Sequence, residues 1–266
     1  MSNPILDVIA RKGWCVTDGA TGSNFFGRGL EAGYPPELWC VERPDEVLWL
    51  HREFLQAGAD LILTNSFGAN APRLKLHKSE NRVREINKAA AQLARQAALE
   101  HADADGNKAI VAGSMGPTGE LFAPMGELTH ESTVAFFTEQ AEALAEGGAD
   151  ALWIETMSST EEVAAAADAA KKTGLPVAAT LTFDTARRSM MGVTPTEYAA
   201  FAKEIGLDLI GSNCGIPQYV DGEIHFHGSP ELMAHYALHA RDAGATVIGG
   251  CCGTTPEHLA AMVEAL

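Results

Sequence analysis

The sequence predicts an α/β fold of the (β/α)8 TIM-barrel type, and three observations point to it. Short apolar segments recur along the 266 residues and alternate with helical segments, as expected for a parallel sheet. The apolar segments are hydrophobic almost throughout, which is typical of strands buried on both faces. Thiol, carboxylate and amide side chains gather at the ends of these segments, where barrels of this type carry their active sites.

Seven segments are predicted as strands because each is an apolar, β-rich run that ends in Gly, Asn, Asp or Thr. They are 14–22, 60–68, 109–119, 151–157, 176–184, 208–215 and 246–253. Seven helices are predicted between and after them, because apolar residues recur there at helical spacing. They are 43–60, 80–101, 131–150, 159–174, 194–208, 229–245 and 255–266. No low-complexity linker interrupts the series, so we expect a single domain over residues 1–266.

One β/α unit is missing from this count, since a barrel of this type has eight strands. Only 14 residues, "GIPQYVDGEIHFHG", separate Cys214 from the helix that begins near Ser229. A crossover alone takes at least ~10–12 residues, so a loop, a helix and a further strand do not fit here. The short run "EIHFH" is a candidate strand, although no helix precedes it. Either the chain lacks a unit after Gly215, or the printed sequence omits a segment.

Composition excludes several classes of protein. The chain carries 35 acidic and 19 basic residues, a net charge of −16, with no basic cluster to neutralise a nucleic-acid backbone. It has no apolar run of the roughly 18 residues needed to span a membrane. Its five cysteines are too few and too irregular for a disulfide framework. We therefore expect a cytoplasmic, reduced protein that binds neither nucleic acid nor membrane; whether it forms a homo-oligomer stays open.

Two adjacent cysteines end the last predicted strand, in "VIGGCCGTT" (247–255), and Cys214 ends the strand before it. Consecutive strand residues point to opposite faces, so Cys251 and Cys252 can face one ion only if the chain bends. The flanking glycines permit that bend. Buried apolar filler and a redox pair are the alternative interpretations. Filler is our interpretation of the lone residues Cys15 and Cys40.

Three thiolates form a donor set that suits zinc. Three protein ligands leave a fourth position open, and a substrate thiol bound there would lose its proton. Because the thiolate is the reactive form of a thiol, such a site predicts activation of a substrate sulfur atom.

Several segments together resemble the homocysteine S-methyltransferase family, which includes betaine–homocysteine methyltransferase and the homocysteine domain of methionine synthase. They are "DGATGSN" (18–24), "HREFLQAGADLILTNSFGAN" (51–70), "GPTGE" (116–120), "NCG" (213–215) and "GGCCGTTPEH" (249–258). The resemblance runs from about residue 12 to the end of the chain. It implies a zinc-containing (β/α)8 barrel that transfers a methyl group to the sulfur of homocysteine, giving methionine.

The resemblance also implies roles for individual residues. Cys214, Cys251 and Cys252 match the zinc ligands of the family. Asp18 and Glu155 match the acids that hold the homocysteine amino group, a role that suits carboxylates facing an ammonium group. Gly19 and Ala20 are expected to offer backbone N–H groups to the amino-acid carboxylate. No catalytic residue is expected beyond the zinc-activated substrate thiolate.

The chain departs from the family pattern at "NCGIPQYVDGE", where relatives continue into a helix and a further strand. Because every other motif is retained, we expect an omitted segment rather than a true deletion. The methyl donor is not fixed by the motifs. An onium donor such as betaine or S-methylmethionine favours aromatic faces, for which Phe25, Trp39 and Phe67 are candidates. The aromatic cage of the animal betaine enzyme is not matched here.

The sequence is also compatible with two other functions. One is a non-catalytic or truncated relative that binds zinc and homocysteine without turnover. The other is a redox-sensing protein in which Cys251 and Cys252 change oxidation state reversibly.

Overall fold

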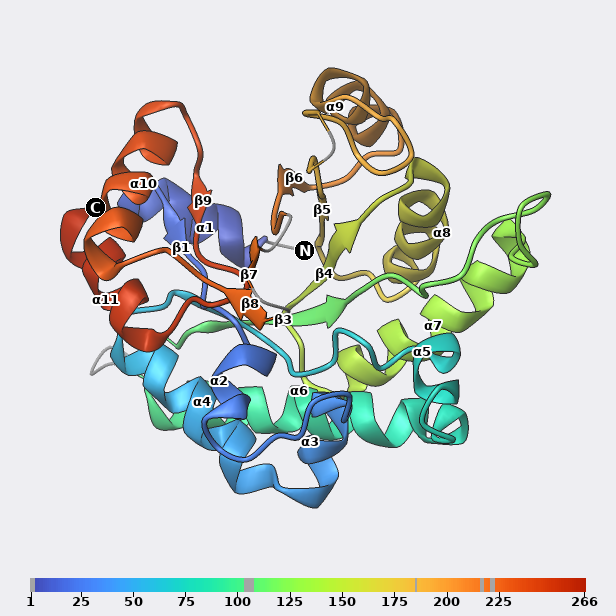
Figure 1. Cartoon of the computed structure of the whole chain (residues 1–266), viewed down its shortest axis with the longest axis horizontal. Coiled ribbons are helices and arrows are strands. Elements are labelled where there is room, and N and C mark those ends of the chain that lie inside the picture. The colour runs from blue at the N-terminus through green and yellow to red at the C-terminus, as the bar shows by residue number, and fades with distance from the viewer. Residues whose placement is uncertain (1–2, 103–107, 185, 216–217, 221–222) are drawn as a thin grey trace. The chain divides into compact units, whose positions relative to one another are not determined.

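The computed structural model describes residues 3–102, 108–184, 186–215, 218–220 and 223–266 (Figure 1). The chain divides into two compact units. The first comprises Met1–Leu63, Leu93–Val111 and Ile216–Leu266, and the second comprises Thr64–Gln92 and Ala112–Gly215. Within the described residues, no helix is long and apolar enough to cross a membrane.

In the first unit, the first and last strands of the chain lie side by side. Strand β1 (Cys15–Val16) pairs in parallel with β9 (Val247–Ile248), and an isolated bridge joins Thr17 to Leu61 of β2 (Leu61–Leu63). Figure 1 shows this pairing as a blue strand beside a red one. The helices are α1 (Pro4–Lys12), α2 (Gly22–Phe26), α3 (Trp39–Glu42), α4 (Pro44–Gln56), α10 (Pro230–Asp242) and α11 (Pro256–Ala265), with a 3-10 turn at Pro36–Leu38. Helix α11 packs against α10 and α4.

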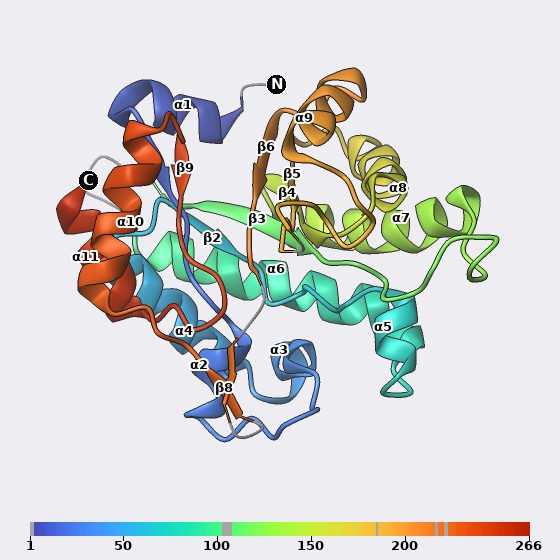
Figure 2. The same ribbon diagram turned by 45° about the horizontal axis from the view of Figure 1, so that its top comes forward.

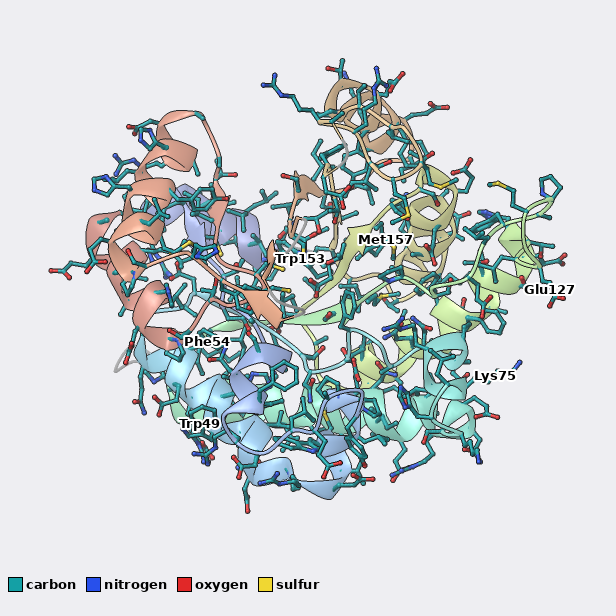
Figure 3. All side chains as sticks on the ribbon, in the orientation of Figure 1. Trp49, Phe54, Lys75, Glu127, Trp153 and Met157 are labelled. Atoms are coloured by element: carbon teal, nitrogen blue, oxygen red, sulfur yellow. The ribbon has the colours of Figure 1, made fainter. Side chains whose placement is uncertain are left out.

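The second unit is built on a parallel sheet. The strands β3 (Ile110–Met115), β4 (Ala151–Met157), β5 (Val177–Leu181) and β6 (Leu209–Ser212) are neighbours in chain order, and β2 precedes β3 in the same sheet. The helices are α5 (Ala71–Lys75), α6 (Val83–Glu100), which extends into the first unit, α7 (His130–Gly147), α8 (Thr160–Lys171) and α9 (Pro195–Glu204), with a 3-10 turn at Glu80–Arg82. Figure 3 labels Trp153 and Met157 on β4, both of them buried.

Sequence features explain where these elements begin and how they pack. Helices α7, α8, α9 and α10 each start at a Ser or Thr whose side chain accepts a hydrogen bond from the first turn. The buried residues of α8 are mostly alanines, so the helix can lie close to the strands β4 and β5 that it contacts. The buried core of this unit includes Leu144, Leu152, Ile154, Val163, Ala166, Ala170, Val177, Leu181 and Tyr198.

All seven predicted strands and all seven predicted helices are present. The strand predicted at 151–157 is present with those bounds, whereas the other six end earlier than predicted because their carboxyl-terminal tails form the loops that follow. The predicted strand 246–253, for example, ends at Ile248. The sequence prediction missed α1, α2, α3 and α5, three of which are only four or five residues long.

The missing β/α unit is confirmed for the described part of the chain. After β6, the chain enters an antiparallel hairpin of β7 (Gln218–Val220) and β8 (Glu223–His225) and then α10 (Figure 2). Only residues 216 and 217 separate Gly215 from β7, so the chain itself lacks the unit. The expectation of an omitted segment is therefore wrong. In β6, the side chain of Ile210 is 47% exposed, whereas Ile154 of β4 is fully buried.

Candidate metal and substrate site

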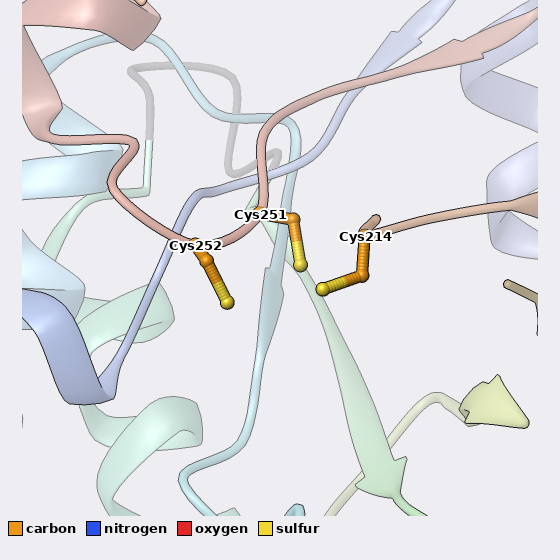
Figure 4. A group of neighbouring side chains, drawn as sticks. All are labelled: Cys214, Cys251 and Cys252. Carbon is orange, nitrogen blue, oxygen red and sulfur yellow. The ribbon is translucent and has the colours of Figure 1, made fainter. Parts of the chain in front are cut away.

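The adjacent cysteines lie on the loop between β9 and α11. Figure 4 shows Cys251 and Cys252 directing their sulfur atoms to the same side of this loop. Cys251 is half-buried and Cys252 is exposed. The loop is closed by a hydrogen bond from the Thr254 N–H to the Cys251 carbonyl (3.0 Å) and by one from the Gly253 N–H to Ser23 Oγ (3.1 Å). The bend that the sequence predicted is therefore present.

The sequence analysis attributed the glycines of this loop to the backbone freedom that a bend requires, but two of them are required for another reason. A Cβ on Gly249 would lie 1.8 Å from Thr17 Oγ1, and one on Gly250 would lie 2.3 Å from the Thr254 side chain. These two glycines are required by close packing rather than by unusual dihedral angles. Only Gly253, at φ +82°, occupies the left-handed region that favours glycine.

Cys214 follows β6 and has a left-handed backbone, with φ +60°. This conformation is uncommon for a residue that carries a Cβ. Cys214 is exposed. The sulfur atoms of Cys214, Cys251 and Cys252 all lie within 4.8 Å of one another.

The other two cysteines are core residues, as predicted. Cys15 is fully buried, and Cys40 is 3% exposed. Burial raises the pKa of the Cys15 thiol to about 12, with a further contribution from Asp60 against the opposing effect of Lys12. Cys15 is therefore a neutral thiol at physiological pH and not a thiolate ligand.

Asp18 and its neighbours lie at the carboxyl end of β1. The Asp18 side chain is 4% exposed, and its Oδ2 accepts a hydrogen bond from the Leu63 N–H at 2.8 Å. A Cβ on Gly19 would lie 2.8 Å from the Thr254 carbonyl and 3.0 Å from Phe54 of α4, which Figure 3 labels. The Ala20 N–H already donates to the Thr254 carbonyl at 3.2 Å. A substrate carboxylate that binds Ala20 must therefore share or replace this bond, so the binding roles of these residues stay predictions.

Glu155 lies near the end of β4, where the strand is irregular. Its register with β5 shifts between Ile154 and Met157, so β4 has one residue more than its partner. Thr156 has φ +59°, and Glu155 is half-buried. Desolvation raises the pKa of Glu155 to about 7; the hydrogen bond from Ser114 Oγ (2.5 Å) lowers it, and Cys214 raises it. A bulge of this kind re-aims a side chain, often beside a functional site.

The three aromatic donor candidates differ in their exposure. Phe25 is fully buried and packs on Trp39, with ring centroids 4.9 Å apart. Trp39 is 4% exposed and is covered by the Arg43 guanidinium, 4.2 Å from its ring centroid. Both therefore have the contacts of core residues, and a donor contact at either ring would require the rings to move. Phe67 is half-buried and packs against Gly116.

Sequence reasoning missed the polar residues that organise these loops. Asn213 was noted only as part of the "NCG" motif, yet its side chain connects the ends of β4, β5 and β6. Glu162 of α8 is buried and accepts hydrogen bonds from the N–H and Oγ of Thr118. Burial raises the pKa of Glu162, and the two hydrogen bonds from Thr118 act in the opposite direction and lower it. The only sequence signal for either residue was a polar side chain next to a motif.

The fold and the thiol cluster define a β/α protein with three cysteines at the ends of its strands, a candidate metal centre. The chain belongs to the homocysteine S-methyltransferase family, because a model of that family matches residues 15–224 and 215–266. The two matched segments overlap at residues 215–224, the region after β6 where the β/α unit is missing.

Curated relatives include the methionine synthases of Mycobacterium leprae, 27% identical, and Mycobacterium tuberculosis, 28% identical. Each match covers 98% of this chain, which spans only about a quarter (25%) of the length of these relatives. Each alignment is 305 positions long, so the relatives carry residues in the matched region that this 266-residue chain lacks.

Solved structures with the same fold include the homocysteine methyltransferase MmuM from Escherichia coli. Its oxidized form has a TM-score of 0.82 and 24% identity, with 100% of both chains covered. Its metallated form has a TM-score of 0.82 and 22% identity, with 99% of this chain and 100% of that chain covered. The TIM-type (β/α) fold predicted from the sequence is thus confirmed.

Proposed function

We propose that this protein transfers a methyl group from a small onium donor to the sulfur of homocysteine in a zinc-dependent reaction. The observation that carries the proposal is the cluster of three thiols, within 4.8 Å of one another, in a chain of the homocysteine S-methyltransferase family. The family relationship supports homocysteine as the acceptor. The metallated form of MmuM, which shares the fold, supports a metal at the cysteines.

The cysteines fit zinc in chemistry and in spacing. Tetrahedral zinc with bonds of about 2.3 Å to sulfur holds its sulfur ligands about 3.8 Å apart. The spacing of these three sulfur atoms, at most 4.8 Å, is close to that value. Cys214, Cys251 and Cys252 would hold the zinc, and its chemistry at this site would be to lower the pKa of a substrate thiol so that the thiolate is present at neutral pH.

The remaining task of the protein is to bind and orient the two substrates. Asp18 and Glu155 are the carboxylates proposed to hold the ammonium group of homocysteine, and the Gly19 and Ala20 N–H groups are proposed to hold its carboxylate. The substrate sulfur attacks the methyl carbon of the donor while the bond from that carbon to the donor heteroatom breaks. The donor leaves with the electron pair as a neutral amine or sulfide, so no general base is needed. Alignment of the two substrates carries most of the rate.

The test is methionine formation by the purified protein with homocysteine and, in turn, betaine, S-methylmethionine or dimethylsulfoniopropionate. We expect about one zinc ion per chain by metal analysis and turnover with at least one donor. Zinc removal and Cys251→Ala should each abolish turnover. The matched control is Cys40→Ala, a buried cysteine outside the cluster, which should retain zinc. Full turnover in the zinc-free protein would refute the proposal.

A second candidate function is a relative that binds zinc and homocysteine without catalysis. The missing β/α unit and the exposed Ile210 of β6 favour it, because a strand buried in a complete sheet is accessible here. The same assay separates the two functions: this candidate predicts stoichiometric zinc, homocysteine binding by calorimetry, and no methionine with any of the three donors.

A further inference from the structure

Asn213 connects the two strand ends that carry Glu155 and Cys214. Its side-chain oxygen Oδ1 accepts hydrogen bonds from the Thr156 N–H (2.9 Å) and from Thr180 Oγ1 (2.7 Å). Its Nδ2 donates to Thr156 Oγ1 (2.7 Å) and, at 3.5 Å, to Glu155 Oε2. Its own carbonyl accepts from Thr182 Oγ1 (3.1 Å). One half-buried amide therefore contacts residues of β4 and β5 from the end of β6.

These contacts fall on the irregular part of β4. The extra residue of the bulge takes the Thr156 N–H out of the regular ladder, and the Asn213 amide supplies its partner. Thr156 is held at φ +59° by bonds to both its N–H and its hydroxyl group. A non-glycine residue in this region persists only where its surroundings fix it. Asn213 therefore fixes the bulge that places Glu155.

The residue after Asn213 is constrained in the same way. Cys214 has φ +60°, and the carbonyl that precedes its N–H, that of Asn213, is held by Thr182. Anchored on both its side chain and its carbonyl, Asn213 determines how the chain leaves β6. All of these bonds lie within the second unit, so they set the local geometry of Cys214 and Glu155 without help from the missing β/α unit.

We propose that Asn213 is a positioning residue that holds the proposed metal ligand Cys214 and the proposed substrate-binding Glu155 in their working conformations. This inference rests on the proposed function for its meaning. An amide is suited to the task because it offers an acceptor and two donors on one planar group. A carboxylate or an aliphatic side chain cannot make the same set of bonds.

The experiment compares Asn213→Ala with wild type in zinc affinity, measured by competition with a chromophoric chelator. We expect affinity to fall about 10–100-fold, the usual effect of removing a residue that orients a metal ligand. Homocysteine affinity, measured by calorimetry on the zinc-loaded protein, should fall as well. Cobalt substitution adds a second readout, because the sulfur-to-cobalt charge-transfer band should weaken if Cys214 no longer binds.

The matched control is Asn87→Ala. Asn87 is another asparagine of the second unit, fully buried, whose Nδ2 donates to the Ala69 and Val83 carbonyls. Its loss should destabilise the fold without changing zinc affinity. If Asn213→Ala and Asn87→Ala lower the unfolding midpoint and both keep wild-type zinc affinity, Asn213 is merely structural and the proposal is overturned.

A second variant and a metal-free readout keep the inference testable if Asn213→Ala folds poorly or if the wild type binds no zinc. Asn213→Asp keeps the oxygen that Thr156 and Thr180 donate to and loses the N–H donors. It should therefore retain zinc better than Asn213→Ala and bind homocysteine more weakly than wild type. In the metal-free protein, alkylation is followed by mass spectrometry at Cys214, with the exposed Cys252 as internal reference. Absence of zinc in wild type would count against the proposed function alone. An unchanged ratio of the two alkylation rates in Asn213→Ala would overturn the role of Asn213.

Discussion

A buried histidine on α4 should make the stability of this protein depend on pH. His51 is 2% exposed, and in the part of the chain that the structure describes its Nε2 has no hydrogen-bond partner. Burial lowers its pKa from 6.5 to about 4. The unfolded chain therefore takes up a proton at this residue as the pH falls below about 6.5, while the folded chain does not until about pH 4. Stability is complete above this window and is lost as the pH falls through it.

The size of the effect follows from the shift in pKa. A shift from 6.5 to about 4 corresponds to about 3 kcal/mol over the whole window, and to about 1.3 kcal/mol between pH 7.5 and 5.5. The assay is urea unfolding of wild type and His51→Leu at both pH values. Leucine cannot titrate and leaves no unpaired buried nitrogen, so the variant should lose this part of the pH dependence and be at least as stable at pH 7.5.

The comparison between variants isolates His51 from other titrating groups. His77→Gln, at an exposed position on the surface, controls for the loss of an imidazole and should leave the wild-type pH dependence in place. Stability curves for wild type and His51→Leu that stay parallel from pH 7.5 to 5.5 would refute the reasoning.

Two further predictions concern packing around the site. Gly249→Ala places a Cβ 1.8 Å from Thr17 Oγ1 and should lower the free energy of unfolding by several kcal/mol, measured in urea, and reduce bound zinc; Gly211→Ala, whose nearest contact would be 3.5 Å, is the tolerated control. A wild-type unfolding midpoint for Gly249→Ala would contradict this. Ile210→Ala should cost under about 1.5 kcal/mol because Ile210 is 47% exposed, whereas Ile154→Ala should cost about 2–5 kcal/mol. Equal losses would show that Ile210 is covered in solution.

The fold was predictable because its signals are local and repeated. Strands such as Ala151–Met157 are continuous apolar runs, and helices such as Pro195–Glu204 begin at a capping threonine followed by proline. The short helices were missed for a physical reason. A segment like Ala71–Lys75 is too short to show helical periodicity, and its start is set by the Asn70 side chain, which accepts from the Arg73 N–H at 3.1 Å.

The candidate site could be predicted only for residues whose type alone indicates their chemistry, as a cysteine indicates a possible metal ligand. Three thiols near strand ends can be recognised in the sequence itself as a candidate metal site. The function of Asn213 depends on a bulge in β4 and a hydroxyl on β5, neither of which leaves a pattern near residue 213. The packing role of Gly249 likewise depends on Thr17, more than two hundred residues away in the chain. Long-range contacts of this kind are fixed by the fold and cannot be read from local spacing.

The lost β/α unit affects the candidate site unevenly. Asn213, the residue before Cys214, is held by Thr180 and Thr182, all within the second unit. Cys251 and Cys252 lie on a loop that packs on Thr17 and bonds to Ser23, both within the first unit. The local geometry of each set of thiols is therefore independent of the deleted segment. A wall of a barrel mainly excludes water from the reacting atoms, and exclusion of water strengthens electrostatic binding of an ammonium group. The deletion should thus weaken homocysteine binding more than zinc binding, and the two affinities, measured separately on this chain, test that expectation.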